Sequence, residues 1–399
     1  MKTNTDKAAI DAFLTRGVEN AFPSRDFVKA RLLEGKPLTM YLGVDPTGPT
    51  LHLGHAIVLM KLREFQDLGH KVILLIGDFT GMIGDPTDKS AARKRLTRKE
   101  VLANAKNYKK QASKILSFTG ANKAELKYNS KWLGKMSFED VVELASHYTV
   151  QQMLERDMFE TRVKEGKPVH LHEFLYPLMQ GYDSVAMDVD GEIGGNDQTF
   201  NMLAGRTLMK ELKHKEKFVI ATKLLTDPTG KKMGKSEGNM ITLEDSAEDM
   251  FGKIMSWPDG MIVPGFEILT RVPMNGIAEQ AASDPRAMKA RLAQDVAAFF
   301  YGDKAAEKAA ASFSSTFQKH EIPTDIPEFV VKGAKMNIIE LLVASKLASS
   351  NGEARRLIDG GGVKVDGHAI EGYDAEVIPT EKGVVIQKGK RHFVRAVRK

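Results

Sequence analysis

Two short runs of apolar residues near the N-terminus most constrain the fold of this chain. They lie at residues 39–44 (TMYLGV) and 71–77 (KVILLIG), and between them residues 54–68 carry apolar side chains at helical spacing. A buried strand, an amphipathic helix and a second buried strand form a βαβ unit, in which the two strands run parallel. This pattern predicts a nucleotide-binding α/β fold whose parallel sheet is covered by helices on both faces.

The remaining chain shows three kinds of pattern. Two further helical segments and one strand are expected in the first 240 residues, at 98–117, 138–158 and 218–222. Residues 243–317 are helical in pattern and predict a separate α domain. Pro323 and Pro327 mark a linker, after which short helices and Gly-rich strands indicate a small domain at 336–399.

Composition narrows the class of protein. A length of 399 residues suits two or three domains, and the absence of cysteine excludes disulfide frameworks, thiolate metal sites and cysteine nucleophiles. The first residues lack the pattern of a secretion signal, and no apolar run approaches the ~18 residues of a membrane span, so a cytoplasmic protein is expected. The formal net charge of +6 permits an anionic partner such as nucleic acid.

A histidine-containing motif follows the first strand. Residues 41–55 (YLGVDPTGPTLHLGH) pass through a Pro/Gly loop into the helix, which places His52 and His55 at a helix N-terminus. Free backbone amides and the helix dipole favour phosphate there, and Gly54 lets a nucleotide approach the backbone. A metal-binding histidine pair is the alternative, and neither cysteine nor an H-E-x-x-H motif supports it.

A lysine-rich loop is the second candidate phosphate element. Residues 229–236 (TGKKMGKS) resemble a Walker-type phosphate loop, but Thr229 stands where the first glycine of that motif belongs. The flanking sequences also lack the strand before and the long helix after that such a loop requires. Taken alone, the segment is equally well interpreted as a solvated basic turn.

Together the two motifs resemble those of class I aminoacyl-tRNA synthetases. His52-Leu-Gly-His55 is similar to their HIGH signature and residues 232–236 (KMGKS) to their KMSKS loop, with Gly234 in place of the usual serine. The resemblance implies a Rossmann-like parallel-sheet catalytic domain at residues 1–240. It also implies that both elements act on one ATP.

Three segments extend the resemblance to tyrosyl-tRNA synthetases over essentially the whole chain: 41–55, 77–93 (GDFTGMIGDPTDKSAAR) and 176–198 (YPLMQGYDSVAMDVDGEIGGNDQ). In the last, Tyr176, Gln180 and Asp183 are spaced to share one helical face. The resemblance implies that Asp183 and Tyr41 meet the phenolic hydroxyl of bound tyrosine, and that Asp85, Tyr176 and Gln180 meet its ammonium group. A buried carboxylate that loses the phenol is left unpaired, which disfavours phenylalanine. A polar network confined to the core is the alternative.

The resemblance assigns further residues to ATP and catalysis. Gly195 and Asp197 are expected at the ribose and Gln198 near the reacting carboxylate, although TFN follows where many relatives have WGN. The implied ATP-binding set is Gly43, Asp45, His52, Gly54, His55, Gly195, Asp197, Lys232, Lys235 and Ser236. The implied catalytic set is His52, His55, Thr47, Lys89, Arg93, Lys232 and Lys235, of which Lys89 and Arg93 close over pyrophosphate. Lys89 and Arg93 otherwise belong to a solvated charged loop.

The C-terminal region resembles the S-four RNA-binding domain. Its core at residues 350–363 is a helix stopped by glycines and followed by a strand, and Arg355 and Arg356 on that helix are expected to contact RNA phosphates. The resemblance further implies an α-helical domain on the anticodon side of tRNA at residues 241–325. It also implies a dimerisation segment at about 130–170, and hence a homodimer.

The expected activity is that of a tyrosine–tRNA ligase. Tyrosine and ATP give tyrosyl-adenylate and pyrophosphate, and the tyrosyl group then moves to the 3′ end of the cognate tRNA. Mg²⁺ is expected to accompany ATP without a dedicated protein-bound metal. The alternatives are a tryptophanyl-tRNA synthetase, a small-molecule nucleotidyltransferase and a non-catalytic RNA-binding relative.

Overall fold

The chain forms two compact units. The computed structural model describes residues 2–85, 96–230, 240–318, 326–331, 333–370, 372–381, 383–389 and 392–398. One unit comprises residues 1–246 and 256–300, and the other comprises 247–255 and 301–399. The division predicted from the sequence, at 1–240, 241–325 and 336–399, stays a prediction.

A six-stranded sheet forms the centre of the first unit. Its strands are β1 (Val18–Phe22), β2 (Thr39–Val44), β3 (Lys71–Ile76), β4 (Glu125–Tyr128), β5 (Gly191–Gly195) and β6 (Phe218–Thr222), in the order β1-β6-β5-β2-β3-β4. All neighbours are parallel except β1, which pairs antiparallel with β6. The predicted α/β fold is confirmed. The strand β3 lies on one side of β2 and β5 lies on its other side, so the strand order reverses between β2 and β5. Ligands of such sheets usually bind at the carboxyl ends of the two strands where the order reverses.

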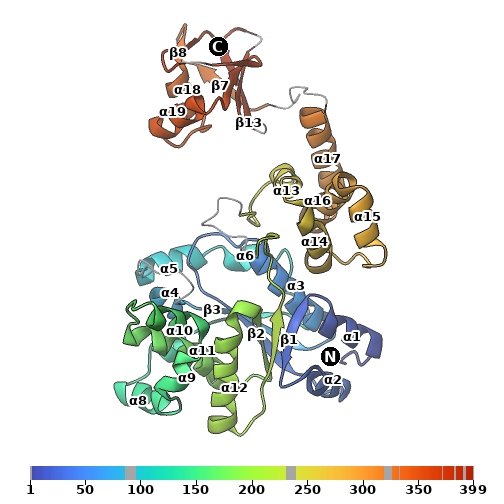
Figure 1. Ribbon diagram of the computed structural model, residues 1–399, viewed down its shortest axis with the longest axis vertical. Helices are drawn as coiled ribbons and strands as arrows, with labels where there is room; N and C mark the ends of the chain where they lie inside the picture. Colours follow the sequence, from blue (N-terminus) through green and yellow to red (C-terminus); the bar gives the residue numbers. More distant parts are fainter. Residues whose placement is uncertain are drawn as a thin grey trace. The chain divides into compact units, whose positions relative to one another are not determined.

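Helices cover both faces of this sheet. The helices of the first unit are α1 (Lys7–Thr15), α2 (Arg25–Leu33), α3 (Leu53–Asp67), α4 (Thr80–Ile83), α5 (Arg98–Ala105), α6 (Tyr108–Ala112), α7 (Ser130–Leu133), α8 (Phe138–Ser146), α9 (Val150–Leu154), α10 (Asp157–Lys164), α11 (Leu171–Met187) and α12 (Thr199–Lys213), then α14 (Ile262–Leu269), α15 (Ile277–Ser283) and α16 (Pro285–Tyr301). Figure 1 shows the strands between the blue helices α1–α3 and the green helices α11 and α12. Every residue of β6 is buried, as expected for a strand covered on both faces.

The predicted helix between β2 and β3 is confirmed as α3, but two longer helical predictions were wrong in extent. Residues 98–117 divide into α5 and α6, and residues 138–158 divide into α8, α9 and the start of α10. The cause of the second break is a cap, because the side chain of Thr149 accepts the backbone N–H of Gln152 and begins a new helix. The apolar periodicity continues across this cap and hides it.

The second unit contains α13 (Ala247–Met255), α17 (Asp303–Gln318) and a small α+β domain. Phe251 of α13 and Phe313 of α17 pack with ring centroids 5.4 Å apart. The α+β domain has helices α18 (Ile338–Ala344) and α19 (Asn351–Asp359), and strands β7 (Glu328–Val331), β8 (Met336–Asn337), β9 (Val363–Val365), β10 (His368–Ala369), β11 (Glu376–Val377), β12 (Val384–Lys388) and β13 (His392–Arg398). Its larger sheet has the order β10-β9-β12-β13-β7. Gly361, at φ 63°, leads from α19 into β9, so the predicted helix, glycine and strand pattern is confirmed.

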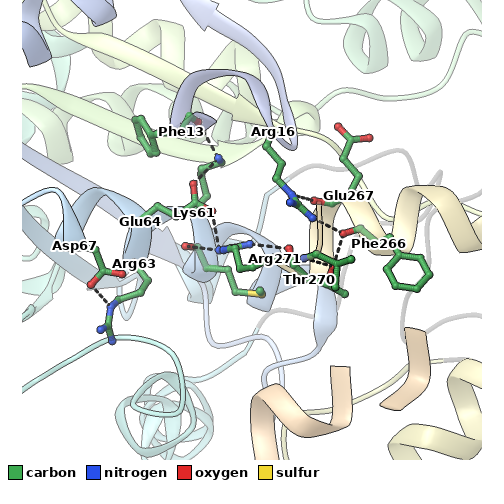
Figure 2. A network of polar contacts seen from close by, with 12 residues as sticks. Phe13, Arg16, Lys61, Arg63, Glu64, Asp67, Phe266, Glu267, Thr270 and Arg271 are labelled. Atoms are coloured by element: carbon green, nitrogen blue, oxygen red, sulfur yellow. Dashed lines mark hydrogen bonds and ion pairs between the residues drawn. The ribbon is translucent and has the colours of Figure 1, made fainter. Parts of the chain in front are cut away.

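A polar network holds the C-terminal half of α3 in the first unit (Figure 2). The Lys61 ammonium donates to the Phe13 carbonyl at 2.7 Å and to Glu64 Oε2 at 2.6 Å, and the other oxygen of Glu64 pairs with Arg271 at 2.7 Å. Arg16 donates to the carbonyls of Phe266 and Glu267 at 2.8 and 2.9 Å. Burial lowers the pKa of Lys61, and Glu64 opposes this shift. Lys61 and Glu64 together therefore join α1, α3 and the segment after α14.

Replacing the Glu64 carboxylate should destabilise the fold. We expect Glu64→Gln to lower the free energy of unfolding by about 2 kcal/mol, because the buried Lys61 ammonium loses its charged partner. Asp67→Asn is the matched control, because its pair with Arg63 lies on the surface, with side chains 59% and 40% exposed, and should change the value by less than about 0.5 kcal/mol. Urea unfolding of both variants measures the difference. Equal effects would contradict a special role for Glu64.

Candidate active site

The two histidines of the H-x-x-H motif organise the N-terminus of α3. His52 is its N-cap, and its Nδ1 accepts the backbone N–H of Gly54 at 3.1 Å, while His55 Nδ1 accepts the backbone N–H of His52 at 3.2 Å. Because each Nδ1 accepts, the hydrogen of each neutral ring lies on Nε2, which is a donor. A Cβ on Gly54 would lie 2.9 Å from the His52 ring, so a glycine is required here.

The segment that follows the lysine-rich loop pairs with this helix start. Leu53 N–H donates to the carbonyl of Ile241 at 3.0 Å, and Leu243 N–H donates to the carbonyl of Leu51 at 2.9 Å. A pocket at this point is lined by His52, Leu53, Gly54, Leu225, Met240, Ile241 and Trp257. Lys232, Lys235 and Ser236 lie outside the described residues, as do Lys89 and Arg93. The described segment just after the KMGKS motif thus contacts the H-x-x-H motif.

A carboxylate follows β2. Asp45 accepts hydrogen bonds from the Tyr176 hydroxyl at 2.9 Å and from Thr80 Oγ1 at 2.6 Å, one on each oxygen. A Cβ on Gly77, which follows β3, would lie 1.9 Å from Asp45 Oδ1. Only a glycine at this position leaves room for the carboxylate. Thr47 is held in the same loop, where its backbone N–H donates to the Asp45 carbonyl at 2.8 Å.

Asp183 on α11 is the most deeply buried of the predicted site carboxylates. It is 3% exposed and accepts from Trp132 Nε1 at 2.7 Å and from Asn129 Nδ2 at 3.2 Å. Asn129 also donates to Thr80 Oγ1 at 3.0 Å, which links Asp183 to the carboxylate after β2. Burial raises the pKa of Asp183, and the Trp132 and Asn129 donors oppose that shift. The roles of Trp132 and Asn129 were missed, because nothing in their local sequence indicates them.

Asp85 lies between two donors. Its Oδ1 pairs with Arg156 Nη2 at 2.8 Å, and its Oδ2 accepts from Gln198 Nε2, also at 2.8 Å. Gln198 in turn accepts from Asn201 Nδ2 at 3.0 Å, so both ends of its amide are engaged. Arg156, which is 8% exposed, was also missed, because the loop before α10 carries no motif.

Tyr41 and Gln180 meet beside the same helix. Tyr41 is fully buried. Its hydroxyl lies 3.1 Å from Ser184 Oγ and donates to the backbone carbonyl of Gln180 at 3.4 Å. Gln180 Nε2 donates to Glu192 Oε1 at 2.9 Å. Burial raises the pKa of Tyr41, and the carboxylates of Glu192 and Asp183 raise it further, which keeps the phenol protonated.

Most of the described site residues follow the carboxyl ends of parallel strands or lie on α11. Gly43 lies in β2, Gly195 ends β5, and Asp197 and Gln198 belong to the 3-10 helix Asn196–Gln198 that follows. A Cβ on Gly195 would lie 2.5 Å from Asp197 Oδ1. The residues meet at the end of the sheet where the strand order reverses, which is the usual ligand site of such sheets.

The described part of the chain holds neither a candidate metal site nor a candidate membrane span. It contains no group of three or more His, Cys, Asp or Glu side chains arranged to hold a metal ion. None of the helices there is long and apolar enough to span a membrane.

Comparison with known proteins gives matches over nearly the whole chain. The family model described as "tRNA synthetases class I (W and Y)" matches residues 33–318, and the model of the "Tyrosine--tRNA ligase SYY-like C-terminal domain" matches residues 318–396. The tyrosine–tRNA ligase of Moorella thermoacetica is 45% identical, with 96% of this chain and 94% of that protein covered. That of Thermotoga maritima is 46% identical, with 96% of each covered.

Solved structures of tyrosyl-tRNA synthetases have the same fold as this chain. A C-terminally truncated mitochondrial tyrosyl-tRNA synthetase of Coccidioides posadasii matches with a TM-score of 0.62 and 27% identity, over 76% of this chain and 91% of that one. The tyrosyl-tRNA synthetase of Archaeoglobus fulgidus, solved with L-tyrosine, has a TM-score of 0.61 and 22% identity, over 76% of this chain and all of that one, and shares the fold. The chain belongs to the tyrosine–tRNA ligase family of class I tRNA synthetases.

Proposed function

We propose that this chain activates L-tyrosine with ATP and transfers the tyrosyl group to the 3′ end of its tRNA, as a tyrosine–tRNA ligase. The buried carboxylate of Asp183 at the end of the sheet carries the proposal. It lies on α11 together with Tyr176 and Gln180, and, in addition to burial, its charge raises the pKa of the Tyr41 hydroxyl. Relatives named tyrosine–tRNA ligase, 43–46% identical over nearly the full length, support it.

Tyrosine recognition rests on acceptors held in place before the substrate arrives. Asp183 and Tyr41 meet the phenolic hydroxyl, and Asp85, Tyr176 and Gln180 meet the ammonium group. Trp132 and Asn129 fix the Asp183 carboxylate, so its alignment costs little when the substrate binds. A phenylalanine ring leaves this carboxylate without a new donor in a buried site, which disfavours that substrate.

The activation step requires positioning and charge stabilisation, not a protein nucleophile. The tyrosine carboxylate attacks the α-phosphate, the new oxygen–phosphorus bond forms, and pyrophosphate leaves with the electron pair of the broken bond. His52 and His55 donate from Nε2 toward the phosphates at the start of α3, with Thr47 beside them. The negative charge that develops on the phosphates is further stabilised by the basic residues predicted from the sequence, namely Lys89, Arg93, Lys232 and Lys235. Ser236 also contacts the ATP.

The residues assigned to the nucleotide provide backbone and polar groups for ATP. Gly43, Gly54 and Gly195 allow close approach, and Asp45 and Asp197 offer carboxylates, of which Asp197 meets the ribose. Mg²⁺ enters as part of the Mg–ATP substrate, coordinated mainly by phosphates and water.

RNA binding and dimerisation complete the proposal. Arg355 and Arg356 are exposed on α19, which supports contact with tRNA phosphates. Exposed apolar side chains gather on α8–α11, where Phe138 is 84% and Leu171 82% exposed, with Val142, Val150 and Val163 also exposed. Large exposed apolar side chains on successive helices are typical of a protein interface, and they support a homodimer through residues 130–170.

The Asp183 assignment predicts a loss of selection. We expect Asp183→Asn to lower kcat/KM for tyrosine in pyrophosphate exchange about 10- to 100-fold, because a charged hydrogen bond to the phenol is lost. The value for phenylalanine should change far less. Asp188→Asn is the matched control, because this exposed residue caps the same helix. An unchanged ratio of tyrosine to phenylalanine in folded Asp183→Asn protein would place Asp183 outside the pocket.

The RNA-binding assignment predicts a separation of the two half-reactions. Replacing Arg355 and Arg356 by Gln should raise KM for tRNA in the charging reaction and leave pyrophosphate exchange unchanged. The slope of log affinity against log salt for tRNA should become shallower by about one to two units. Lys36→Gln, an exposed lysine of the first unit, is the control. Loss of exchange in the double variant, or an unchanged salt slope, contradicts the assignment.

A further inference from the structure

A buried ion pair behind the proposed tyrosine pocket has no role in the reaction as described above. Lys217, directly before β6, is fully buried, and Glu192 on β5 is 1% exposed. The Lys217 Nζ donates to Ser184 Oγ at 2.8 Å, to the Met202 carbonyl at 3.1 Å and to Glu192 Oε2. These three acceptors match the three hydrogens of an ammonium group; burial lowers the pKa of Lys217, and the Glu192 carboxylate opposes that shift.

The surrounding helices are shaped to hold this pair. A Cβ on Gly205, inside α12, would lie 2.4 Å from Lys217 Nζ and 2.8 Å from Ser184 Oγ. A Cβ on Gly181 of α11 would lie 3.1 Å from the backbone nitrogen of Gly205. A glycine within a helix is less favourable than alanine, and a buried ion pair is often no more stable than apolar residues of the same volume. Stability alone therefore does not account for the arrangement.

The pair connects directly to Gln180. The second oxygen of Glu192 accepts from Gln180 Nε2 at 2.9 Å. An ionised carboxylate can only accept hydrogen bonds, so the amide nitrogen of Gln180 must face Glu192. The carbonyl oxygen Oε1 then faces away from Glu192, and it is the end of the amide that can accept from an ammonium group.

The pair also acts on Tyr41. Glu192 is in register with Tyr41 across the parallel pairing of β2 and β5. Lys217 donates to Ser184 Oγ, which lies 3.1 Å from Tyr41 Oη in a contact where either hydroxyl can donate. The ammonium group thus contacts the hydroxyl that is hydrogen-bonded to Tyr41.

We propose that Glu192 and Lys217 are positioning residues for the amino-acid substrate, which hold the Gln180 amide with Oε1 toward the tyrosine ammonium group. The inference rests on the proposed function, in which Gln180 meets that group. Lys217 pairs with one oxygen of Glu192, and the other oxygen of this carboxylate fixes the orientation of Gln180.

The variant Glu192→Gln should reverse this orientation. The new amide turns its oxygen toward Lys217 and its NH₂ toward position 180. Gln180 must then present Oε1 to that NH₂ and its own NH₂ to the substrate ammonium group, so two donors face each other. The desamino analogue 3-(4-hydroxyphenyl)propionate lacks the ammonium group and should be insensitive to this reversal.

The test measures Kd for L-tyrosine and for the analogue by equilibrium dialysis, without ATP. For Glu192→Gln we expect tyrosine to bind at least tenfold more weakly and the analogue to change less than threefold. Glu216→Gln is the matched control. Glu216 is next to Lys217 in the sequence, but its ion pair with Arg206 is partly exposed. Equal weakening of both ligands, or no weakening, overturns the inference.

An exchange of side chains provides an independent check. In Gln180→Glu/Glu192→Gln, the residue at 180 can accept both from the new amide and from the ammonium group. We expect the preference for tyrosine over the analogue to return to within about threefold of the wild-type value. Loss of this preference in the folded double variant, judged by thermal unfolding, overturns the inference even if Glu192→Gln does not fold. Failure of the wild-type protein to bind tyrosine contradicts the proposed function instead.

Discussion

A carboxylate removed from water must be surrounded by donors, and this requirement organises the centre of the first unit. Asp45, Asp183 and Glu192 each accept from two different side chains. The donors come from α11, from the segments after β3 and β4 that include α4 and α7, and from the residue before β6. Satisfying these acids therefore fixes α11 against the carboxyl ends of the strands.

The backbone makes room for this chemistry at two glycines. A side chain at Gly77 would occupy the position of the Asp45 carboxylate, and one at Gly205 would occupy that of the Lys217 ammonium group. Both glycines lie where two elements meet closely. Polar side chains can thus sit in the interior while the packing around them remains dense.

Part of this arrangement could be predicted from the sequence, since it depends on local pattern. The β2, α3 and β3 unit follows from apolar periodicity, and the position of His52 at a helix start follows from the loop before it. Tyr176, Gln180 and Asp183 occur at intervals of four and three residues, which places them on one side of α11. The partners Trp132, Arg156 and Lys217 could not be predicted, because each contacts the site from a distant segment with no motif of its own. The break before α9 was hidden because apolar periodicity continues through the cap at Thr149.

We expect this buried network to form a pocket for tyrosine in particular. Amino-acid-dependent exchange of pyrophosphate into ATP, with tyrosine, tryptophan and phenylalanine compared on one preparation, tests it most directly. We expect rapid exchange with tyrosine, and exchange with tryptophan or phenylalanine lower by orders of magnitude. Exchange driven by tryptophan, or none with any of the three, would contradict it.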